Sequence, residues 1–272
     1  EIYRLIESAD IALTNFKKGS DEKFKMDYKT LSALNPRLIY GSITGFVSKA
    51  EKVAFDLVLQ AETGFMFMNG TQESGPVKMP VALIDVLAAH QLKEGVLIAL
   101  LKKEKTGRGA YVSVSLEESA LASLANQACN FLMAKHIPQR MGSLHPNIAP
   151  YGEIVKTRDG FNLVLAIGTD AQFKAFCKII GRDDLGSHPD FSENPNRVKN
   201  RVELEKAILV AVKKMRKEEL MAKCLKNYVP IGEIKNLQQV MQNPVARNMI
   251  LKEEINGEPT ERLKTVAFHI DE

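Results

Sequence analysis

The sequence has no apolar run long enough for a membrane-spanning helix, which needs about 20 residues; the longest candidate is residues 95–101. Cysteine is also scarce, and Cys129, Cys177 and Cys224 are an odd number at wide spacings. They predict neither a disulfide framework nor a zinc site, and they favour a reducing, cytoplasmic location. The net charge is only +4, from 37 basic and 33 acidic residues, which argues against a nucleic-acid partner.

Several motifs of well-known chemistry are absent as well. The sequence contains no serine-hydrolase elbow, no paired zinc ligands and no Gly-x-Gly-x-x-Gly run. The glycine-rich residues 106–109 follow a predicted helix instead of leading into one, so we interpret them as a helix terminator and not as a phosphate loop. The composition that remains, 45% hydrophobic and 26% charged residues, is typical of a soluble globular protein.

The first third of the chain has the pattern of a parallel α/β unit. Residues 10–14 and 38–42 have strand character, and residues 28–34 between them have helical spacing that ends at Asn35-Pro36. A strand, a helix and a strand in that order predict parallel pairing in an α/β sheet. Residues 56–68 predict a further helix, and residues 110–115 a further strand.

Residues 85–109 predict a long helix with a broad apolar surface. We expect Asp85 to begin this helix and Gly107 to end it, with lysines near its last turn where cations suit the helix dipole. Gly95 lies inside the helix, where glycine costs about 1 kcal/mol relative to alanine, so it predicts a close approach of another backbone. Ser115 and Glu118 have capping-box spacing and predict the next helix, which runs to about residue 134.

The composition changes at residues 137–150, which are rich in proline, glycine, histidine and asparagine and predict a crossing between domains. Residues 152–157 and 161–167 then predict two strands joined in a hairpin by Asp159-Gly160. Helices follow at residues 171–180, 201–215 and 218–227, so this part predicts a small α+β domain.

Asp85 has two compatible interpretations. Aspartate is among the best helix N-caps, and the residues alone favour that role. Four apolar residues precede it, however, and a poorly solvated carboxylate in such a setting is more nucleophilic. His145 has the weaker claim to catalysis, since a single loop histidine is more often structural or exposed. The lysines at 17, 23 and 52 can contact phosphates near strand ends, although the residues alone favour a solvated charged surface.

Together these segments resemble the class III CoA-transferases, the group that includes formyl-CoA transferase, carnitine CoA-transferase and the α-methylacyl-CoA racemases. The resemblance covers essentially the whole chain. The matching segments are residues 9–11, 15–16, 34–40, 55–61, 95–100, 105–109, 150–151, 159–160 and 229–232, with Asp85 in the middle of the series.

The resemblance implies a large Rossmann-like α/β domain over residues 1–145, a small α+β domain over 146–235 and a return segment to the large domain over 236–272. It also implies a homodimer of interlocked chains, and substrates that are an acyl-CoA and a small carboxylic acid, with no bound prosthetic group. About 70 residues that begin the family's large domain have no counterpart here, so we expect a chain truncated at its start, and also at its end.

The family's catalytic aspartate begins the helix that ends in a Thr-Gly-Arg/Lys-Gly turn, and Asp85 holds that place. The resemblance therefore implies that Asp85 attacks the thioester and briefly carries CoA. It also assigns CoA contacts to these positions: Asn15, Phe16, Lys17, Lys23, Lys52, Val53, Ala54 and Phe55.

Two alternatives remain open in the sequence. The first is an α-methylacyl-CoA racemase or epimerase, but the histidine that racemases carry before the aspartate at 56 is Phe55 here, and racemisation needs two acid–base groups. Asp170 holds the place of the racemases' second acid. The second alternative is a non-catalytic CoA-binding relative. Lys17-Lys18 and a shortened glycine-rich stretch after Gly45 also depart from the family pattern.

Overall fold

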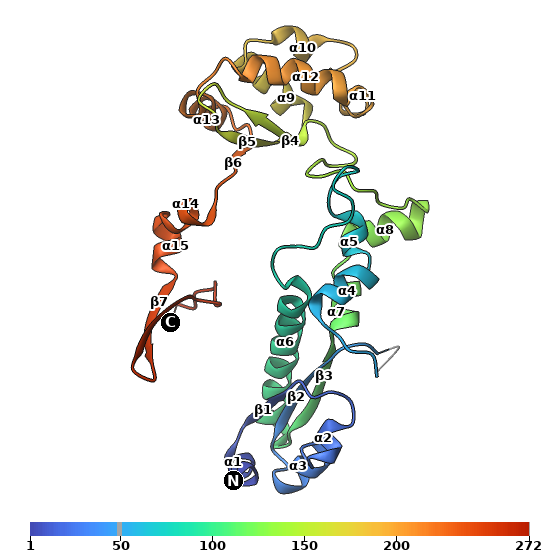
Figure 1. Ribbon diagram of the computed structural model, residues 1–272, viewed down its shortest axis with the longest axis vertical. Helices are drawn as coiled ribbons and strands as arrows, with labels where there is room; N and C mark the ends of the chain where they lie inside the picture. The colour runs from blue at the N-terminus through green and yellow to red at the C-terminus, as the bar shows by residue number, and fades with distance from the viewer. Residues whose placement is uncertain (48–50, 272) are drawn as a thin grey trace. The chain divides into compact units, whose positions relative to one another are not determined.

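Three parallel strands organise the first part of the chain. The computed structural model describes residues 1–47 and 51–271, which form two units, Glu1–Gly142 and Ser143–Glu272. In the first unit, β1 (Ile11–Thr14), β2 (Ile39–Thr44) and β3 (Ala110–Ser115) pair in the order β1-β2-β3 (Figure 1). Both pairings are parallel, so the predicted α/β unit is confirmed.

Helices cover both faces of this sheet. On one face, Ile39 packs with Leu92, Val96 and Ala99 of α6 (Leu83–Thr106). The opposite face contacts α1 (Ile2–Ser8) and α3 (Tyr28–Leu34), and the buried cluster there consists of Ile6, Leu31, Leu38 and Tyr40. The short helix α2 (Ser20–Lys23) lies between β1 and α3 in the chain. Apolar side chains therefore fix α6 against the sheet.

Helix α6 begins two residues earlier than the sequence predicted. Its N-cap residue is Ala82, which makes no side-chain capping bond, and Asp85 is the third helical residue. The prediction that Asp85 caps the helix is therefore wrong. The helix ends as predicted at Gly107, whose φ of 68° is left-handed and whose N–H bonds to the Lys103 carbonyl. The Lys103 side chain does not extend to solvent: it is buried, with Nζ 2.7 Å from Asp10 Oδ1.

Two predicted helices are each interrupted. Residues 56–68 form α4 (Asp56–Glu62) and α5 (Phe65–Met68), because Gly64 between them adopts a φ of 91°. The helix after β3 divides into α7 (Leu116–Ala122) and α8 (Ala125–Ala134), where Ala125 has a φ of 47°. Ser115 caps α7 as predicted, since its Oγ accepts from the Glu118 N–H at 3.0 Å.

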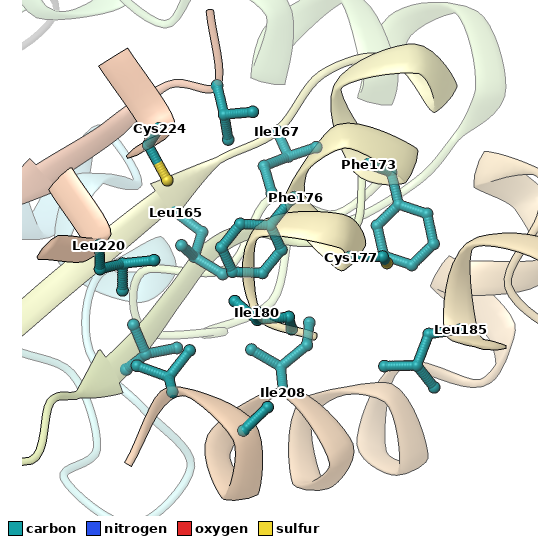
Figure 2. Close-up of a cluster of buried hydrophobic side chains, with 14 of the residues drawn as sticks. Leu165, Ile167, Phe173, Phe176, Cys177, Ile180, Leu185, Ile208, Leu220 and Cys224 are labelled. Carbon is teal, nitrogen blue, oxygen red and sulfur yellow. The ribbon is translucent and has the colours of Figure 1, made fainter. Parts of the chain in front are cut away.

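The second unit is built on an antiparallel sheet in the order β4-β5-β6. Strands β4 (Tyr151–Lys156) and β5 (Asn162–Ala166) form the predicted hairpin, and β6 (Ile231–Glu233) is an addition that the sequence did not indicate. Figure 2 shows the core of this unit, where β5 and the helices bring their apolar side chains together; its buried residues include Leu165, Phe176, Ile208 and Leu220.

The remaining elements of the second unit follow in chain order. The helices are α9 (Asp170–Ile179), α10 (Asp183–Ser187), α11 (Asn194–Lys199), α12 (Arg201–Val212), α13 (Lys217–Lys226), α14 (Leu237–Met241) and α15 (Pro244–Asn248). A separate hairpin, β7 (Ile250–Ile255) with β8 (Glu258–Leu263), follows them. That residues 236–272 return to the large domain stays a prediction. Within residues 1–47 and 51–271, no helix is long and apolar enough to cross a membrane.

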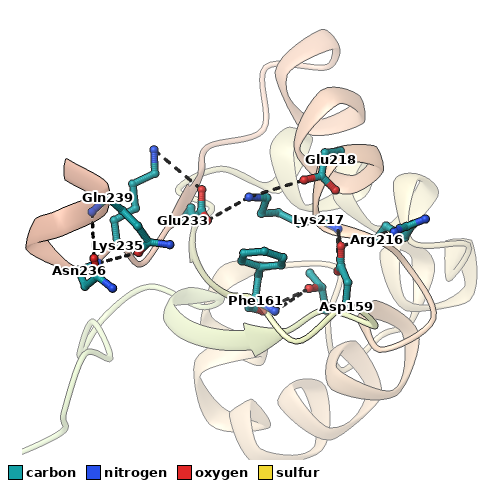
Figure 3. Close-up of polar contacts among 10 residues, drawn as sticks. Asp159, Phe161, Arg216, Lys217, Glu218, Glu233, Lys235, Asn236 and Gln239 are labelled. Atoms are coloured by element: carbon teal, nitrogen blue, oxygen red, sulfur yellow. Dashed lines mark hydrogen bonds and ion pairs between the residues drawn. The ribbon is translucent and has the colours of Figure 1, made fainter. Parts of the chain in front are cut away.

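A polar network joins the hairpin turn to α13 and β6 (Figure 3). Asp159 accepts from the Lys217 N–H at 3.1 Å, so a distant carboxylate caps α13, whose own N-cap residue makes no side-chain bond. The Lys217 ammonium lies 3.1 Å from Glu233 and 4.0 Å from the centre of the Phe161 ring. The hydrogen bond from Thr157 chiefly holds the pKa of Asp159 below its usual value.

Gly95 provides a direct test of the packing of α6 on β3. A Cβ at this position would lie 2.6 Å from Val112 Cγ1, so the close neighbour is a stiff β-branched side chain and not the predicted backbone. Gly95→Ala gains about 1 kcal/mol of helix propensity, but the clash costs about 1–3 kcal/mol, so we expect a net loss of stability in urea unfolding. In a Val112→Ala background the same change should stabilise the protein. Stabilisation by Gly95→Ala in both backgrounds would contradict this packing.

Candidate active site

Asp85 lies in the first turn of α6 and is exposed. Its carboxylate makes no hydrogen bond or ion pair with any residue of the described ranges 1–47 and 51–271. Its backbone N–H is also unbonded within those ranges, whereas the neighbouring N–H groups of Leu83 and Val86 bond to the carbonyls of Val81 and Ala82. Asp85 is thus a carboxylate with free oxygens beside a free backbone donor.

A carboxylate from another helix caps the start of α6. Asp56, the first residue of α4, accepts from the Ile84 N–H through Oδ1 at 2.7 Å. Its other oxygen, Oδ2, accepts from Gln60 Nε2 at 2.5 Å, and Gln60 Oε1 accepts from the Met79 N–H at 2.8 Å. Asp56 therefore performs the capping that the sequence assigned to Asp85, which explains why α6 begins before Asp85.

The pKa of Asp85 is raised above its usual value. Partial withdrawal of the carboxylate from water is the larger cause, and the negative charge of Asp56 adds to it. Although the residue surface is exposed, the carboxylate is thus less well solvated than in a free peptide. A poorly solvated carboxylate without hydrogen bonds is the form of the group that attacks an electrophile most readily.

The predicted contact residues 15, 16, 17 and 23 follow the carboxyl end of β1, where ligands bind in open α/β sheets. Asn15 lines a cleft of about 470 Å³ together with Ala89, Leu92 and Lys93 of α6 and residues of β1 and β2. Such a volume lies in the range of small-molecule sites. Asp85 lies one helical turn before Ala89 and does not line this cleft.

The other three residues of this group lie close to the cleft's strand in the chain but do not line it. The Phe16 ring is 6.2 Å from the Phe24 ring, and Lys23 Nζ is 5.9 Å from the centre of the same ring. Lys17 and Lys23 are exposed and make no ion pair within residues 1–47 and 51–271. Their contact with a phosphate stays a prediction.

The predicted contact residues 52–55 precede α4. Lys52 is paired with Glu62 and lies 4.8 Å from the centre of the Phe46 ring, so its charge is already partly balanced. Ala54 packs on the end of β2, since a Cβ at Gly45 would lie 2.2 Å from Ala54 Cβ. Val53 and Phe55 are exposed.

One residue of each group is related to α6, Asn15 through the cleft and Phe55 through its chain neighbour Asp56. Asn15 meets Ala89 and Lys93 across the cleft, and Phe55 adjoins Asp56, which binds the N–H beside Asp85. The structure gives no hydrogen bond or ion pair between the two groups within the residues that it describes.

Two other residues singled out in the sequence have structural roles in the second unit. Asp170 Oδ1 lies 2.6 Å from the guanidinium of Arg197, which is fully buried and also donates to the Ala149 carbonyl at 2.6 Å. His145 Nδ1 accepts from the Asn147 N–H at 3.1 Å, and its ring lies 5.2 Å from that of Tyr151. Among the described residues, no group of three His, Cys, Asp or Glu side chains is arranged to hold a metal ion.

The sequence did not indicate that Asp56 and Gln60 hold the start of α6, or that Lys93 lines the cleft. Asp56 was part of the resemblance but was given no function, because nothing in the local sequence relates it to Ile84. One signal was present: an Asp at the start of an apolar helix with Gln four residues later is a polar pair on one helix face. Its partner 28 residues away becomes visible only in the folded chain.

Comparison with known proteins gives a consistent family assignment. The family model described as CoA-transferase family III matches residues 2–271. The succinate–glutarate CoA-transferase of Agrobacterium fabrum is 34% identical over 260 residues, which cover 94% of this chain and 64% of that protein. The acetyl-CoA:oxalate CoA-transferase of Acetobacter aceti is 31% identical, covering 91% of this chain and 65% of that protein. This chain therefore spans less than two thirds of these relatives.

Solved structures show the same fold. A CAIB/BAIF family protein from Brucella suis superposes with a TM-score of 0.83 at 33% identity, covering 98% of this chain and 71% of that one. A protein from Mycobacterium tuberculosis gives a TM-score of 0.85 at 26% identity, covering 99% of this chain and 73% of that one. The expected α/β fold of this family is thereby confirmed.

The raised pKa of Asp85 predicts a cost in stability that depends on pH. A carboxyl whose pKa is higher in the folded than in the unfolded state destabilises the fold when it is ionised. The loss begins near the unfolded pKa of about 4 and grows as the pH rises through the folded pKa. We expect Asp85→Asn to raise the thermal midpoint at pH 7 and to leave it unchanged below about pH 3.5. A lower midpoint at pH 7 would show that the fold stabilises the carboxylate.

Proposed function

Because the chain belongs to CoA-transferase family III, we propose that this protein moves CoA from an acyl-CoA to a carboxylic acid, with Asp85 as the nucleophile. The observation that carries the proposal is the Asp85 carboxylate itself. It lies in the first turn of α6 with no hydrogen-bond partner among the described residues, and its pKa is raised. Covalent catalysis by a carboxylate needs such a group.

In the first half of the reaction, an Asp85 oxygen attacks the carbonyl carbon of the bound acyl-CoA. The C–S bond breaks, its electron pair leaves with sulfur as CoA thiolate, and a mixed anhydride joins Asp85 to the acyl group. The thiolate then attacks the Asp85 carbonyl of this anhydride. The donor acid leaves as a carboxylate, and Asp85 carries CoA as a thioester.

In the second half, a carboxylate oxygen of the acceptor acid attacks the Asp85 thioester. The CoA thiolate leaves again and a second mixed anhydride forms, now between Asp85 and the acceptor. Attack of the thiolate on the acceptor's carbonyl yields the new acyl-CoA and restores the Asp85 carboxylate. Every charge and electron pair is accounted for without a prosthetic group, and acyl-CoA serves as the substrate.

Each attack creates a tetrahedral oxyanion that needs a hydrogen-bond donor. Asp56 occupies the Ile84 N–H, and the N–H groups of Leu83 and Val86 bond to carbonyls. Among the first-turn residues 83–86, Asp85 alone keeps an unbonded N–H within the part of the chain that the structure describes. This N–H is the donor that we assign to the oxyanion.

Acyl-CoA binding is proposed along the first turns of α6, between the residues after β1 and the segment before α4. The contacts are those that the resemblance implies: Asn15, Phe16, Lys17, Lys23, Lys52, Val53, Ala54 and Phe55. Lys17 and Lys23 form no ion pair with the residues that the structure describes, so they are better candidates for phosphate contacts than Lys52, which already pairs with Glu62.

Dicarboxylates are the acids to test first, because the relatives are named for succinate, glutarate and oxalate. Transfer is favoured over racemisation because Phe55 cannot move a proton and Asp170 is held by Arg197. A homodimer of interlocked chains and a cytoplasmic location stay predictions. The relatives exceed this chain in length, so residues outside it can contribute to the whole protein's site.

A direct test follows CoA transfer by mass spectrometry. The full-length protein is incubated with succinyl-CoA and a panel of free acids, alongside Asp85→Ala and the control Asp183→Ala, which removes a first-turn carboxylate from α10. We expect a new acyl-CoA with wild type and with the control, and a loss of at least about 10⁴-fold in rate with Asp85→Ala, because the covalent route is removed. Turnover retained by Asp85→Ala would refute the nucleophile.

A further inference from the structure

The segment that leads into the Asp85 turn is held by two side chains of α4. This segment, residues 77–82, has no regular secondary structure over most of its length, and its last residue makes no side-chain cap. Gln60 of α4 binds the Met79 N–H at 2.8 Å, and Asp56 binds the Ile84 N–H at 2.7 Å. The chain is therefore fixed on both sides of the entrance to α6.

Gln60 makes this arrangement specific. Its side chain is fully buried, and both ends of its amide are engaged, Nε2 with Asp56 Oδ2 at 2.5 Å and Oε1 with Met79. A buried amide whose donor and acceptor are both satisfied has one favourable orientation. If the amide were flipped, its NH₂ group would face the Met79 N–H and its oxygen would face the Asp56 carboxylate. Gln60 thus orients the Asp56 carboxylate so that its other oxygen, Oδ1, accepts from the N–H of Ile84, the residue before Asp85.

Asp56 is also the charge that acts on Asp85. Helix α6 packs against α4, α7, β2 and β3, and the two strands carry no charged residue. The other carboxylates on those helices are engaged: Glu62 pairs with Lys52, Glu117 accepts from the Val47 N–H, and Glu118 accepts from Ser115. On α6 itself, the nearest titratable groups are His90 and Lys93, one and two turns further along.

We propose that Asp56 and Gln60 are positioning residues for Asp85, which hold the first turn of α6 and set the protonation of the nucleophile without touching the substrate. This inference rests on the proposed function of Asp85. It assigns two effects to one side chain: the hydrogen bond of Asp56 fixes the direction of the Asp85 carboxylate, and its charge keeps that carboxylate more basic.

The two effects separate in different variants. Asp56→Ala removes the hydrogen bond and the charge, and we expect kcat to fall by about 10²-fold, as a misplaced reacting group does. Asp56→Asn keeps an acceptor for Ile84 but places its Nδ2 against Gln60 Nε2. Adding Gln60→Glu restores donor–acceptor complementarity, so the double variant should recover kcat relative to Asp56→Asn. Recovery of this kind would not follow from a general loss of stability.

The pH profile provides the second readout. In the wild type, the acid limb of kcat/KM reports the pKa of Asp85 in the free enzyme. Removing the negative charge in Asp56→Asn should move this limb to lower pH, since Asp56 contributes to the raised pKa. Two measurements that do not depend on activity accompany it. NMR titration should give a lower pKa for the Asp85 carboxyl in Asp56→Asn, and hydrogen exchange of the Ile84 amide should be faster in Asp56→Ala, which lacks the acceptor.

Asp27→Ala is the matched control. Asp27 caps α3 in the same unit by accepting from the Thr30 N–H at 3.0 Å, so its loss removes an equivalent cap elsewhere. We expect this control to reduce stability but to leave kcat, the acid limb and the Asp85 titration unchanged. If the Asp56 variants show the same behaviour as Asp27→Ala, the inference is overturned.

The inference and the proposed function fail in distinguishable ways. If Asp85→Ala retains transfer, the nucleophile is wrong whatever Asp56 does. If Asp85→Ala abolishes transfer but Asp56→Ala and Asp56→Asn leave the Asp85 titration and the Ile84 exchange rate unchanged, the positioning role alone is wrong. Should Asp56→Ala not fold, Asp56→Asn and its double variant still decide the question.

Discussion

The hydrogen bond between the Ile84 N–H and Asp56 is the interaction on which the site depends. It determines where α6 begins, and so places Asp85 inside the first turn instead of at the cap. If Asp85 capped the helix, its carboxylate would accept a hydrogen bond from a backbone N–H. Because Asp56 supplies that acceptor, the oxygens of Asp85 stay free for chemistry, and the nearby negative charge makes them more basic.

The same physical arrangement occurs in the second unit with a structural purpose. Asp159 caps α13 from the hairpin turn, and there hydrogen bonds hold its pKa low and stabilise the ionised form. Asp85 has the opposite electrostatics, with a raised pKa and no bonded partner among the described residues. The Asp159 carboxylate thus stabilises the fold, whereas the Asp85 carboxylate stays reactive. Strained or poorly solvated groups of this kind are typical of functional sites.

The sequence predicts local features of this chain well and distant contacts poorly. Strand–helix–strand order, the Gly107 terminator and the Asp159-Gly160 hairpin all depend on neighbouring residues, and the structure confirms them. The predicted start of α6 was wrong because the Ile84 N–H is capped by Asp56, which lies 28 residues earlier in the chain. Likewise, Lys103 was expected near the helix end, where cations suit the dipole, but the sequence did not indicate its burial or its partner Asp10, which is 93 residues away.

The candidate site shows the same division. Asp85 could be selected from its apolar surroundings and from the family resemblance, but the roles of Asp56 and Gln60 emerge only when α4 and α6 pack together. The most direct test of the account is to incubate the full-length protein with an acyl-CoA and no acceptor, then locate bound CoA by peptide mass spectrometry. The account predicts CoA joined to Asp85 as a hydroxylamine-sensitive thioester. CoA on another residue, or unmodified Asp85 in a sample that transfers CoA once an acceptor acid is added, would contradict it.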